Sequence, residues 1–393
     1  MHVVLTVTTS QDLDDTAYSA LIAAEIGRLR AQINEKAVCD LASSLNGNRS
    51  CTLEYPSQVV GSQALMGCAN YHARIRFGNA SPSWLMRVPR VSGFAVGLPI
   101  RLAEYLICSE YATLKFLEST TVPAPRAFSF GIPSQGTGHG VGVCFLLMEE
   151  LPGRPWDGQG DAAKIWKGLA EIYAELARHP FSRAGSLCVE SPDELPSISA
   201  TASDRFQYLA LIADGQLYPQ FPVEAYLVYR FLQENATQLS DSEGKFFLEH
   251  VDDKGDHLMV DGDSNITGII DWQMARVVPR REVFALSLVS ADMRALCDGT
   301  VSLSSKDVAL RNAVHEKDLG LAQHMEDEKA RRFFWGLGLE PKWAYALPLA
   351  NAILRVFGVE QCWDEWKEVA LERYGREGRL KALIQECSVD AGI

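Results

Sequence analysis

Two aspartates, Asp252 and Asp271, have the type and spacing of groups that perform acid–base or metal chemistry. They flank a predicted hairpin in which two short apolar runs are joined by the turn-forming stretch 261–265. Strands hold the polar groups at their ends in defined positions. A carboxylate held in this way can take a proton from a hydroxyl or bind an oxygen-loving metal ion. Segment 246–273 is therefore the first candidate for an active site.

The same segment contains the letters HVDDKGDHLMV followed by IIDWQ, and it resembles the aminoglycoside phosphotransferase and choline kinase-like family. That family has His-Gly-Asp, four residues, Asn, an apolar strand and then Ile-Asp-Trp. The matching positions are His250, Asp252, Val260, Asp261, Ile270, Asp271 and Trp272. Two positions depart from the motif: Val251 replaces the glycine, and His257 stands where the family has its metal-binding asparagine.

This resemblance implies an α+β, bilobal protein-kinase-like fold with a small antiparallel-sheet N-lobe and a larger, mostly helical C-lobe. The boundaries it suggests are a helical lead-in over 1–49, an N-lobe over 50–147, a hinge over 148–152 and a C-lobe over 153–393. The catalytic segment 246–273 then belongs to the C-lobe.

The resemblance also implies an activity: ATP-dependent transfer of a phosphoryl group to a hydroxyl of a small molecule. In that reaction Asp252 is the base and Asp271 binds magnesium or manganese. Lys254 follows Asp252 by two residues, as the loop lysine of protein kinases does, and could neutralise the transferred phosphate. His257 is a candidate for both a catalytic and a metal-binding role.

Candidates for the nucleotide side lie in the N-lobe. The stretch from Gly67 to Asn70 resembles the hairpin turn that covers the phosphates, where glycine permits a close backbone approach. Arg87, in the apolar stretch WLMRVP, resembles the basic strand residue that grips the nucleotide. Glu110 resembles its ion-pair partner on the following helix, and Glu104 is the rival candidate.

The apolar run 143–151 ends at a Pro-Gly pair and resembles the strand that leads into the hinge between kinase lobes. Backbone groups near Met148, Glu149 and Leu151 would then bind the adenine ring. Backbone recognition does not require particular side chains, so these three positions rest on the resemblance alone.

His257 leaves a second class of function open. Magnesium prefers carboxylate, carbonyl and water ligands, whereas imidazole suits zinc, copper and nickel. The fold could therefore serve a repurposed enzyme or a ligand-binding pseudokinase that carries out non-phosphoryl chemistry without ATP or metal. Asp252, Lys254 and His257 would then act as acid and base groups, since histidine titrates near neutral pH.

The elements that must position these residues follow from apolar periodicity. The pattern predicts a single lead-in helix over 13–45, strands within 50–90 and an irregular stretch over 183–222. Further helices are predicted over 103–119, 161–180, 223–239, 282–296, 306–332, 342–357 and 359–387.

Composition limits the partners and the location. A net charge of −13 disfavours nucleic acid as a ligand, and no run of about 18 apolar residues predicts a membrane span. The nine cysteines include no CxxC pair and their number is odd, which indicates reduced thiols in the cytoplasm. The family resemblance, rather than composition, implies a small-molecule acceptor, and the oligomeric state is left open.

Overall fold

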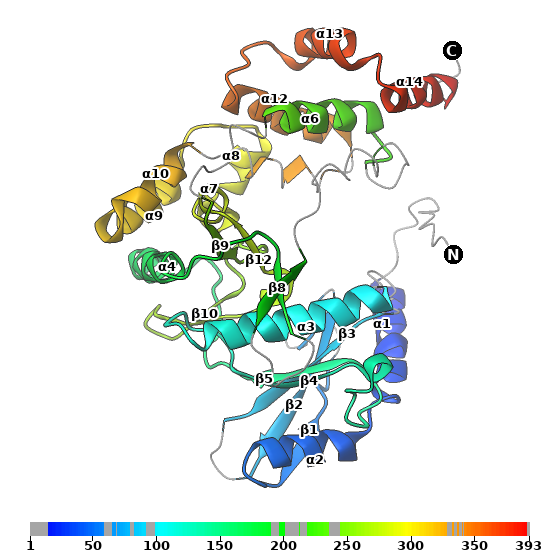
Figure 1. Ribbon diagram of the computed structural model, residues 1–393, viewed down its shortest axis with the longest axis vertical. Helices are drawn as coiled ribbons and strands as arrows, with labels where there is room; N and C mark the ends of the chain where they lie inside the picture. Colours follow the sequence, from blue (N-terminus) through cyan, green and yellow to red (C-terminus); the bar gives the residue numbers. More distant parts are fainter. Residues whose placement is uncertain are drawn as a thin grey trace.

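The computed structural model describes residues 15–58, 65–67, 69–78, 82–91, 99–189, 196–200, 212, 218–235, 244–327, 332–333, 336–337, 340 and 342–390. Within these ranges the chain forms a sheet-containing N-lobe and a larger, mostly helical C-lobe (Figure 1). The α+β bilobal fold predicted from the sequence is thus confirmed. Among the described helices, none has both the length and the apolar character needed to cross a membrane.

The N-lobe is built on a five-stranded antiparallel sheet with the strand order β1-β2-β3-β5-β4. Its strands are β1 (Cys51–Glu54), β2 (Asn70–Phe77), β3 (Trp84–Pro89), β4 (Ala127–Gly131) and β5 (Phe145–Glu149). Successive side chains of a strand point to opposite faces. In β5, Phe145 and Leu147 join one buried cluster, and Leu146 and Met148 join another. The sheet is therefore covered on both faces.

Helix α3 (Ile100–Leu117) covers the face of this sheet that is turned toward the C-lobe (Figure 1). It begins three residues before the predicted 103–119 and ends two residues earlier. Most of its side chains are buried, including Glu110. A helix enclosed on this scale can hold a charged side chain only if that charge finds a partner.

The lead-in segment differs from its prediction, because two helices replace the single helix expected over 13–45. Helix α1 (Asp15–Arg30) and helix α2 (Glu35–Leu45) are separated by a short break. The side chain of Asn34 accepts a hydrogen bond from the amide of Ala37 at 3.2 Å and caps α2. The cap starts a new helix, which apolar periodicity alone did not reveal.

The predicted catalytic segment has the strand–loop–hairpin form expected of it. Strand β9 (Phe246–Glu249) leads in, and β10 (Leu258–Val260) pairs with β11 (Ile266–Ile269) across the turn. The carboxylate of Asp261 accepts hydrogen bonds from the amides of Asp263 and Asn265, both at 2.9 Å. This closes the turn and sets the register that places Asp271 two residues after β11.

Short strands and one-turn helices complete the framework around this hairpin. They are β6 (Arg154–Pro155), β7 (Ser186–Cys188), β8 (Ser197–Ala200), β12 (Arg276–Pro279), η1 (Pro133–Gln135), η3 (Trp272–Met274) and η4 (Leu288–Ser290). Strand β6 pairs with β10, and β12 pairs with β9. Strands β7 and β8 pair inside the stretch predicted to be irregular, most of which lies outside the described residues.

The longer elements of the C-lobe are helices. They are α4 (Ala162–Leu176), α6 (Pro222–Asn235), α7 (Arg280–Val283), α8 (Met293–Cys297), α9 (Ser305–Lys317), α10 (Leu319–Asp327), α12 (Trp343–Val356), α13 (Trp363–Tyr374) and α14 (Gly378–Asp390). Three helix predictions joined separate elements. Segment 306–332 is divided at Asp318, between α9 and α10. Segment 282–296 is divided by the cap at Ser287, and segment 359–387 is divided after Tyr374, where Gly375 ends α13.

Two hydrophobic cores divide the C-lobe. One core includes residues of α3, α4, β9–β12 and α9 and so continues into the N-lobe. The other is formed by α6 and α12–α14, which lie together at the far end of the molecule in Figure 1. Because α3 and the catalytic segment share the first core, packing fixes Glu110 and Asp271 relative to each other.

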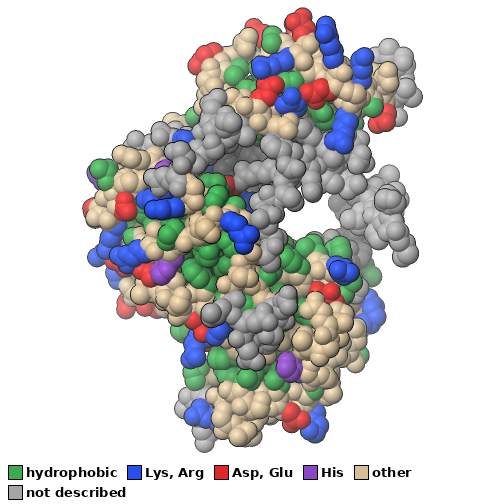
Figure 2. All heavy atoms as spheres, viewed as in Figure 1, with side chains coloured by type: hydrophobic (Ala, Val, Ile, Leu, Met, Phe, Trp, Pro, Cys, Tyr) green, Lys and Arg blue, Asp and Glu red, His purple; other side chains and the backbone are tan. Residues whose placement is uncertain are grey.

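Charge is distributed without a dominant patch on the face drawn in Figure 2. Lysine and arginine side chains are interspersed with aspartate and glutamate side chains on its described atoms. The described part of this face therefore has the mixed charge of ordinary globular proteins.

Candidate active site

The centre of the candidate site is Arg87 on strand β3. Its Nη1 donates to Glu110 Oε1 at 2.7 Å and Oε2 at 2.8 Å, and to Asp271 Oδ1 at 2.8 Å. The predicted contact between Arg87 and Glu110 is therefore confirmed. The rival candidate, Glu104, accepts a hydrogen bond from the hydroxyl of Ser134 instead. One guanidinium thus joins β3, α3 and the end of the catalytic hairpin.

Asp271 occupies an unusual backbone conformation at this junction. Its φ of 68° and ψ of 48° lie in the left-handed region, which non-glycine residues seldom adopt. Burial raises the pKa of its carboxyl, but the nearby Arg87 outweighs that effect and the net pKa is lowered. The side chain remains 46% exposed although Arg87 is 5% exposed. Asp271 is therefore an ionised carboxylate with one oxygen held by the protein and a substantial part accessible.

Glu110 has the opposite electrostatic character. Burial raises its pKa to about 7, Arg87 partly offsets the increase, and the negative charge of Asp271 adds to it. The side chain is 1% exposed. The single positive charge of Arg87 is thus shared between two carboxylates, and the pKa rises at the more buried of the two, Glu110.

His72 is a member of this cluster that the sequence analysis missed. It lies on β2 directly opposite Arg87 in the register, and its Nε2 accepts from Arg87 Nε at 3.1 Å. Its Nδ1 lies 3.0 Å from the carbonyl oxygen of Leu65, so Nδ1 carries the proton. Burial and the charge of Arg87 lower its pKa to about 3. A neutral His72 therefore accepts a hydrogen bond from Arg87 Nε and so orients the guanidinium group.

Asn70 and Gln273 form a second connection between the lobes. Asn70 Nδ2 donates to Gln273 Oε1 at 2.7 Å, and Gln273 Nε2 donates to Asn70 Oδ1 at 3.4 Å. Both side chains are buried. Asn70 was predicted to touch the nucleotide, yet its amide bonds the residue two positions after Asp271. A contact between Asn70 and the nucleotide therefore stays a prediction, and it would have to use the backbone of Asn70 rather than its side chain.

The turn that Asn70 closes is held by short backbone contacts. The amide of Gly67 donates to the carbonyl of Asn70 at 3.0 Å, and the amide of Arg90 donates to the carbonyl of Ala69 at 2.9 Å. Met66 also forms a bridge with Tyr71. This is the reversal expected of a hairpin turn; Cys68 lies outside the described residues.

The hinge positions are partly occupied by the sheet. The amide of Glu149 donates to the carbonyl of Arg126 at 2.9 Å, and Met148 pairs with Leu85 across β3. Leu151 packs its side chain against Gly268 of β11. Binding of adenine by Met148, Glu149 and Leu151 therefore stays a prediction that depends on their remaining backbone groups.

Asp252 and Lys254 lie on the exposed loop between β9 and β10. Lys254 Nζ contacts Asp252 Oδ1 at 2.9 Å and Oδ2 at 2.8 Å, and the side chains are 43% and 42% exposed. Burial lowers the pKa of Lys254, but Asp252 outweighs this effect and the net pKa is raised. Both groups are charged and reachable from solvent.

His257 is buried beneath this loop. Its ring stacks on that of His250 with a centroid distance of 4.2 Å, and burial lowers the pKa of both rings to about 4. The amide of Gly255 points at His257 Nδ1 at 3.4 Å, which leaves Nε2 as the protonated nitrogen, 3.6 Å from Asp253 Oδ1. His257 is therefore neutral and presents an N–H group rather than a free lone pair.

Asp252 and Asp271 both influence the electrostatics of His257. The charges of Asp252 and Asp271 both oppose the lowering of the His257 pKa, and Asp271 also acts on Lys254. Among the described residues, no group of three or more His, Cys, Asp or Glu side chains could hold a metal ion by itself. Magnesium is commonly bound by one or two carboxylates together with substrate phosphates and water. The carboxylate of Asp271 fits that arrangement, and metal binding by His257 stays a prediction.

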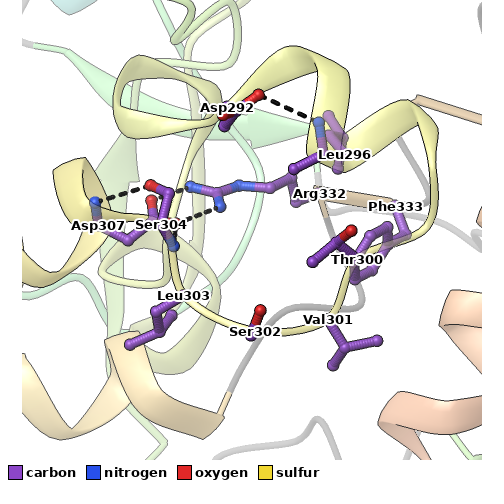
Figure 3. Close-up of a pocket in the computed structure, with 11 residues that line it drawn as sticks. Asp292, Leu296, Thr300, Val301, Ser302, Leu303, Ser304, Asp307, Arg332 and Phe333 are labelled. Carbon is purple, nitrogen blue, oxygen red and sulfur yellow. Dashed lines mark hydrogen bonds and ion pairs between the residues drawn. The ribbon is translucent and has the colours of Figure 1, made fainter.

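A pocket lies elsewhere in the C-lobe, around Arg332 and Asp307 (Figure 3). It is lined by Asp292, Ala295, Leu296, Thr300, Val301, Ser302, Leu303, Ser304, Asp307, Arg332 and Phe333. None of the residues predicted to do chemistry lines it. Arg332 and Asp307 are bonded to each other, and Asp292 accepts a hydrogen bond from the amide of Ala295 as the cap of α8, so the pocket is not assigned a ligand.

Comparison with known protein families gives a match over the central part of the chain. The model of the phosphotransferase enzyme family matches residues 76–297, which is more than half of the chain and includes the Arg87, Glu110, Asp252 and Asp271 positions. The chain belongs to this family. The suspected relationship to phosphotransferases of kinase-like fold is therefore confirmed, and the His257 position is a departure inside a family member. No curated protein sequence matches the chain.

Solved structures of the phosphotransferase family are similar to the chain at low sequence identity. A GDP complex of wild-type aminoglycoside 2'-phosphotransferase-IIIa is 16% identical, covers 88% of this chain and 97% of its own, and has a TM-score of 0.45. Aminoglycoside phosphotransferase APH(4)-Ia is 12% identical, with coverages of 84% and 100% and a TM-score of 0.48. A thermostable mutant of the latter, in ternary complex with ADP and hygromycin B, is 11% identical, with coverages of 88% and 98% and a TM-score of 0.42.

Proposed function

We propose that this protein transfers the γ-phosphoryl group of ATP to a hydroxyl group of a small molecule. The observation that carries the proposal is the Arg87 cluster, which holds an ionised and partly exposed Asp271 in a fixed position at the end of the catalytic hairpin. Phosphoryl transfer depends mainly on positioning and on stabilisation of the phosphate charge. Membership of the phosphotransferase family supports the same reaction class.

Asp271 and Arg87 serve the nucleotide side in this proposal. Asp271 would hold magnesium, which when bound neutralises phosphate charge, and manganese could replace it. Arg87 would contact a phosphate oxygen with part of its guanidinium while Glu110 and His72 keep its orientation. Gly67 and Asn70 would lie above the phosphates, and backbone groups at 148–151 would bind the adenine.

Asp252 serves the acceptor side. Its carboxylate would orient the acceptor hydroxyl and accept its proton while the oxygen bonds to the γ-phosphorus and ADP departs with the bridging oxygen. Lys254, 2.8 Å from Asp252, would contact the transferred phosphate. His257 would assist by donating a hydrogen bond from Nε2 to this loop, since the amide of Gly255 engages its other nitrogen.

The alternative is a repurposed enzyme or pseudokinase that uses the same cleft without phosphoryl transfer. The observation that favours it is His257 at the position of the metal-binding asparagine of the family. The two functions separate cleanly in one experiment. Purified protein is incubated with a panel of hydroxylated small molecules, with and without ATP and with magnesium or manganese, and products are identified by mass.

A gain of one phosphate that requires both ATP and the metal ion supports the proposal. Substitution of Asp252 by alanine is then expected to lower turnover by roughly 10²- to 10⁴-fold, the usual contribution of a positioned base. Conversion of a substrate in the absence of ATP would overturn the proposal in favour of the repurposed enzyme. Absence of ATP binding in calorimetry with either metal would overturn it in favour of a different ligand.

The His257→Asn variant gives the matched comparison, because it restores the oxygen ligand of the family without changing Asp252 or Asp271. A phosphotransferase is expected to need less magnesium in this variant. In a repurposed enzyme the same substitution is expected to lower the native activity, because His257 then has a chemical role of its own.

A further inference from the structure

Helix α1 lies outside the part of the chain that matches the phosphotransferase family, yet it packs firmly on the N-lobe sheet. Ile22 and Ile26 are each 1% exposed and share a buried cluster with Tyr71 and Ala73 of β2. Arg30 Nε donates to the hydroxyl of Tyr71 at 2.8 Å. The helix is thus fixed against the strand that begins at the turn over the phosphates.

A buried ion pair connects α1 to that turn. Arg90 Nε donates to Glu25 Oε1 at 2.7 Å and Arg90 Nη2 donates to Glu25 Oε2 at 3.0 Å, a bidentate arrangement. The side chains are 3% and 4% exposed. Removing two charges from water is costly, and a hydrophobic pair of similar volume would often serve stability as well or better. A contribution to stability alone therefore does not explain why this ion pair is buried here.

The remaining contacts of Arg90 indicate what the pair does. Its third guanidinium nitrogen, Nη1, donates to the carbonyl oxygen of Gly67 at 3.2 Å, and its backbone amide donates to the carbonyl of Ala69 at 2.9 Å. One residue therefore holds both ends of the short turn, and Glu25 fixes the direction in which its guanidinium points.

The turn is also joined to the segment that carries Asp271. Asn70 ends it and bonds Gln273, which follows Asp271 by two residues. The contacts therefore run from Glu25 through Arg90 to the turn, and from the turn to the segment that carries Asp271. Helix α1 lies at one end of this series and the candidate metal ligand at the other.

We propose that Glu25 and Arg90 are positioning residues for the nucleotide, and that α1 is a supporting element of the phosphate-binding turn. The proposal rests on the function proposed above, since it assigns the turn at Gly67 to the nucleotide phosphates. Neither residue touches the reacting atoms. Their contribution is to fix the backbone of the turn, whose amides would otherwise have to be ordered when ATP binds.

The test removes the polar contacts while preserving the buried volume. In the Glu25→Leu/Arg90→Met double variant an apolar pair replaces the ion pair, and thermal stability is expected to be similar to that of the wild type or higher. The affinity for ATP with magnesium, measured by calorimetry, is expected to fall roughly ten- to hundredfold, the scale found for groups that orient ligands from a second layer. A merely structural pair would leave this affinity unchanged, and that result overturns the proposal.

The control is the Glu54→Leu/Arg76→Met double variant, which removes an ion pair between β1 and β2 of the same sheet. That pair is about half exposed, at 51% and 50%, and is not near the turn in the register. This control variant is expected to bind ATP with the same affinity as the wild type. If the buried double variant proves less stable than the wild type, Arg90→Lys carries the same measurement, because lysine keeps the charge but cannot bind Glu25 bidentately.

Hydrogen exchange separates this proposal from the proposed function, because it needs no nucleotide. The amides of Gly67 and Arg90 are expected to exchange faster in the buried double variant than in the wild type or the control. If the wild type binds no ATP, the proposed function and the positioning of the nucleotide are overturned together, and faster exchange then supports only a role of Glu25 and Arg90 in holding the turn. Unchanged exchange at the turn overturns that role whatever the wild type binds.

Discussion

Two arginine–carboxylate clusters of this protein contain the same chemistry and behave in opposite ways. In the C-lobe, Arg332 Nη2 and Nη1 donate to Asp307 Oδ1 at 2.8 Å and Oδ2 at 3.1 Å (Figure 3). Ser290 Oγ donates to the same carboxylate at 2.7 Å, and the amide of Ser304 donates to it at 2.9 Å. The cluster around Arg87 instead divides one guanidinium between two carboxylates.

The two clusters shift the pKa values of their buried carboxylates, Asp307 and Glu110, in opposite directions. Burial raises the pKa of Asp307, but Arg332 and the other donors outweigh it and the net pKa is lowered. Burial raises the pKa of Glu110 to about 7, because Arg87 is shared and Asp271 adds a second negative charge. A structural cluster satisfies its charges internally, whereas the site leaves a carboxylate that a ligand could complete. Perturbed pKa values of this second kind are typical of functional sites.

The largest effect that would break this comparison is expected from Asp271→Asn. Loss of the carboxylate proposed to hold the metal ion should lower turnover about 10⁴-fold, equivalent to ~5.5 kcal/mol of barrier. Stability should change little, because asparagine can still accept from Arg87. Turnover is measured in the phosphate-transfer assay and stability by urea unfolding; retained turnover would remove the metal-binding role.

Asp307→Ala should have the next largest effect, and on stability instead of chemistry. It leaves the largely enclosed Arg332 without its carboxylate partner, which should lower the free energy of unfolding by about 3–5 kcal/mol. The control is Glu171→Ala, which removes an exposed ion pair between Glu171 of α4 and Lys317 of α9, the helix that also carries Asp307. No measurable loss of stability is expected for this variant. If Asp307→Ala unfolds at the same urea concentration as the control, the cluster is not structural.

A pH series should show opposite slopes for the two clusters. The ordinary pKa of Glu110 is 4.5, so between pH 4.5 and 7 the folded protein holds a proton that the unfolded chain has released. Its contribution to stability is complete below this range and is lost as the pH rises through it, by ~3 kcal/mol. Asp307 has a lowered pKa, so its contribution is present above its ordinary value and is lost as the pH falls.

Urea unfolding of the wild type and Glu110→Gln at several pH values measures the Glu110 contribution. The wild type should lose stability relative to the glutamine variant as the pH rises from 4.5 to 7, because glutamine does not titrate. Parallel curves for the two proteins would show that Glu110 has no raised pKa and that the two clusters do not differ in this respect.

The smallest effect is expected from the amide pair that joins the lobes. Gln273→Ala leaves the buried side chain of Asn70 without its hydrogen-bond partner on Gln273 and should lower the free energy of unfolding by about 1–3 kcal/mol. The double-mutant cycle with Asn70→Ala isolates the contact from other losses. Additive losses in this cycle would show that the pair does not couple the N-lobe to the Asp271 segment.

The sequence by itself determined the elements whose signals are local. The catalytic hairpin could be predicted because two apolar runs, a turn and two aspartates lie within a short stretch. The contact of Arg87 with Glu110 was predicted from the resemblance to the phosphotransferase family, and the structure contains it. Helix boundaries were less well determined, since N-caps at Asn34 and Ser287 begin new elements inside stretches that apolar periodicity had joined.

Only the tertiary structure decided which distant polar groups meet. His72 could be paired with Arg87 only once the β2–β3 register was known, and Glu25 lies 65 positions from Arg90. Asn70 and Gln273 are 203 positions apart and have no local signal that joins them. Such contacts form because hydrophobic packing of α1, α3 and the two lobes brings the backbones together, and buried polar groups must then find partners within reach.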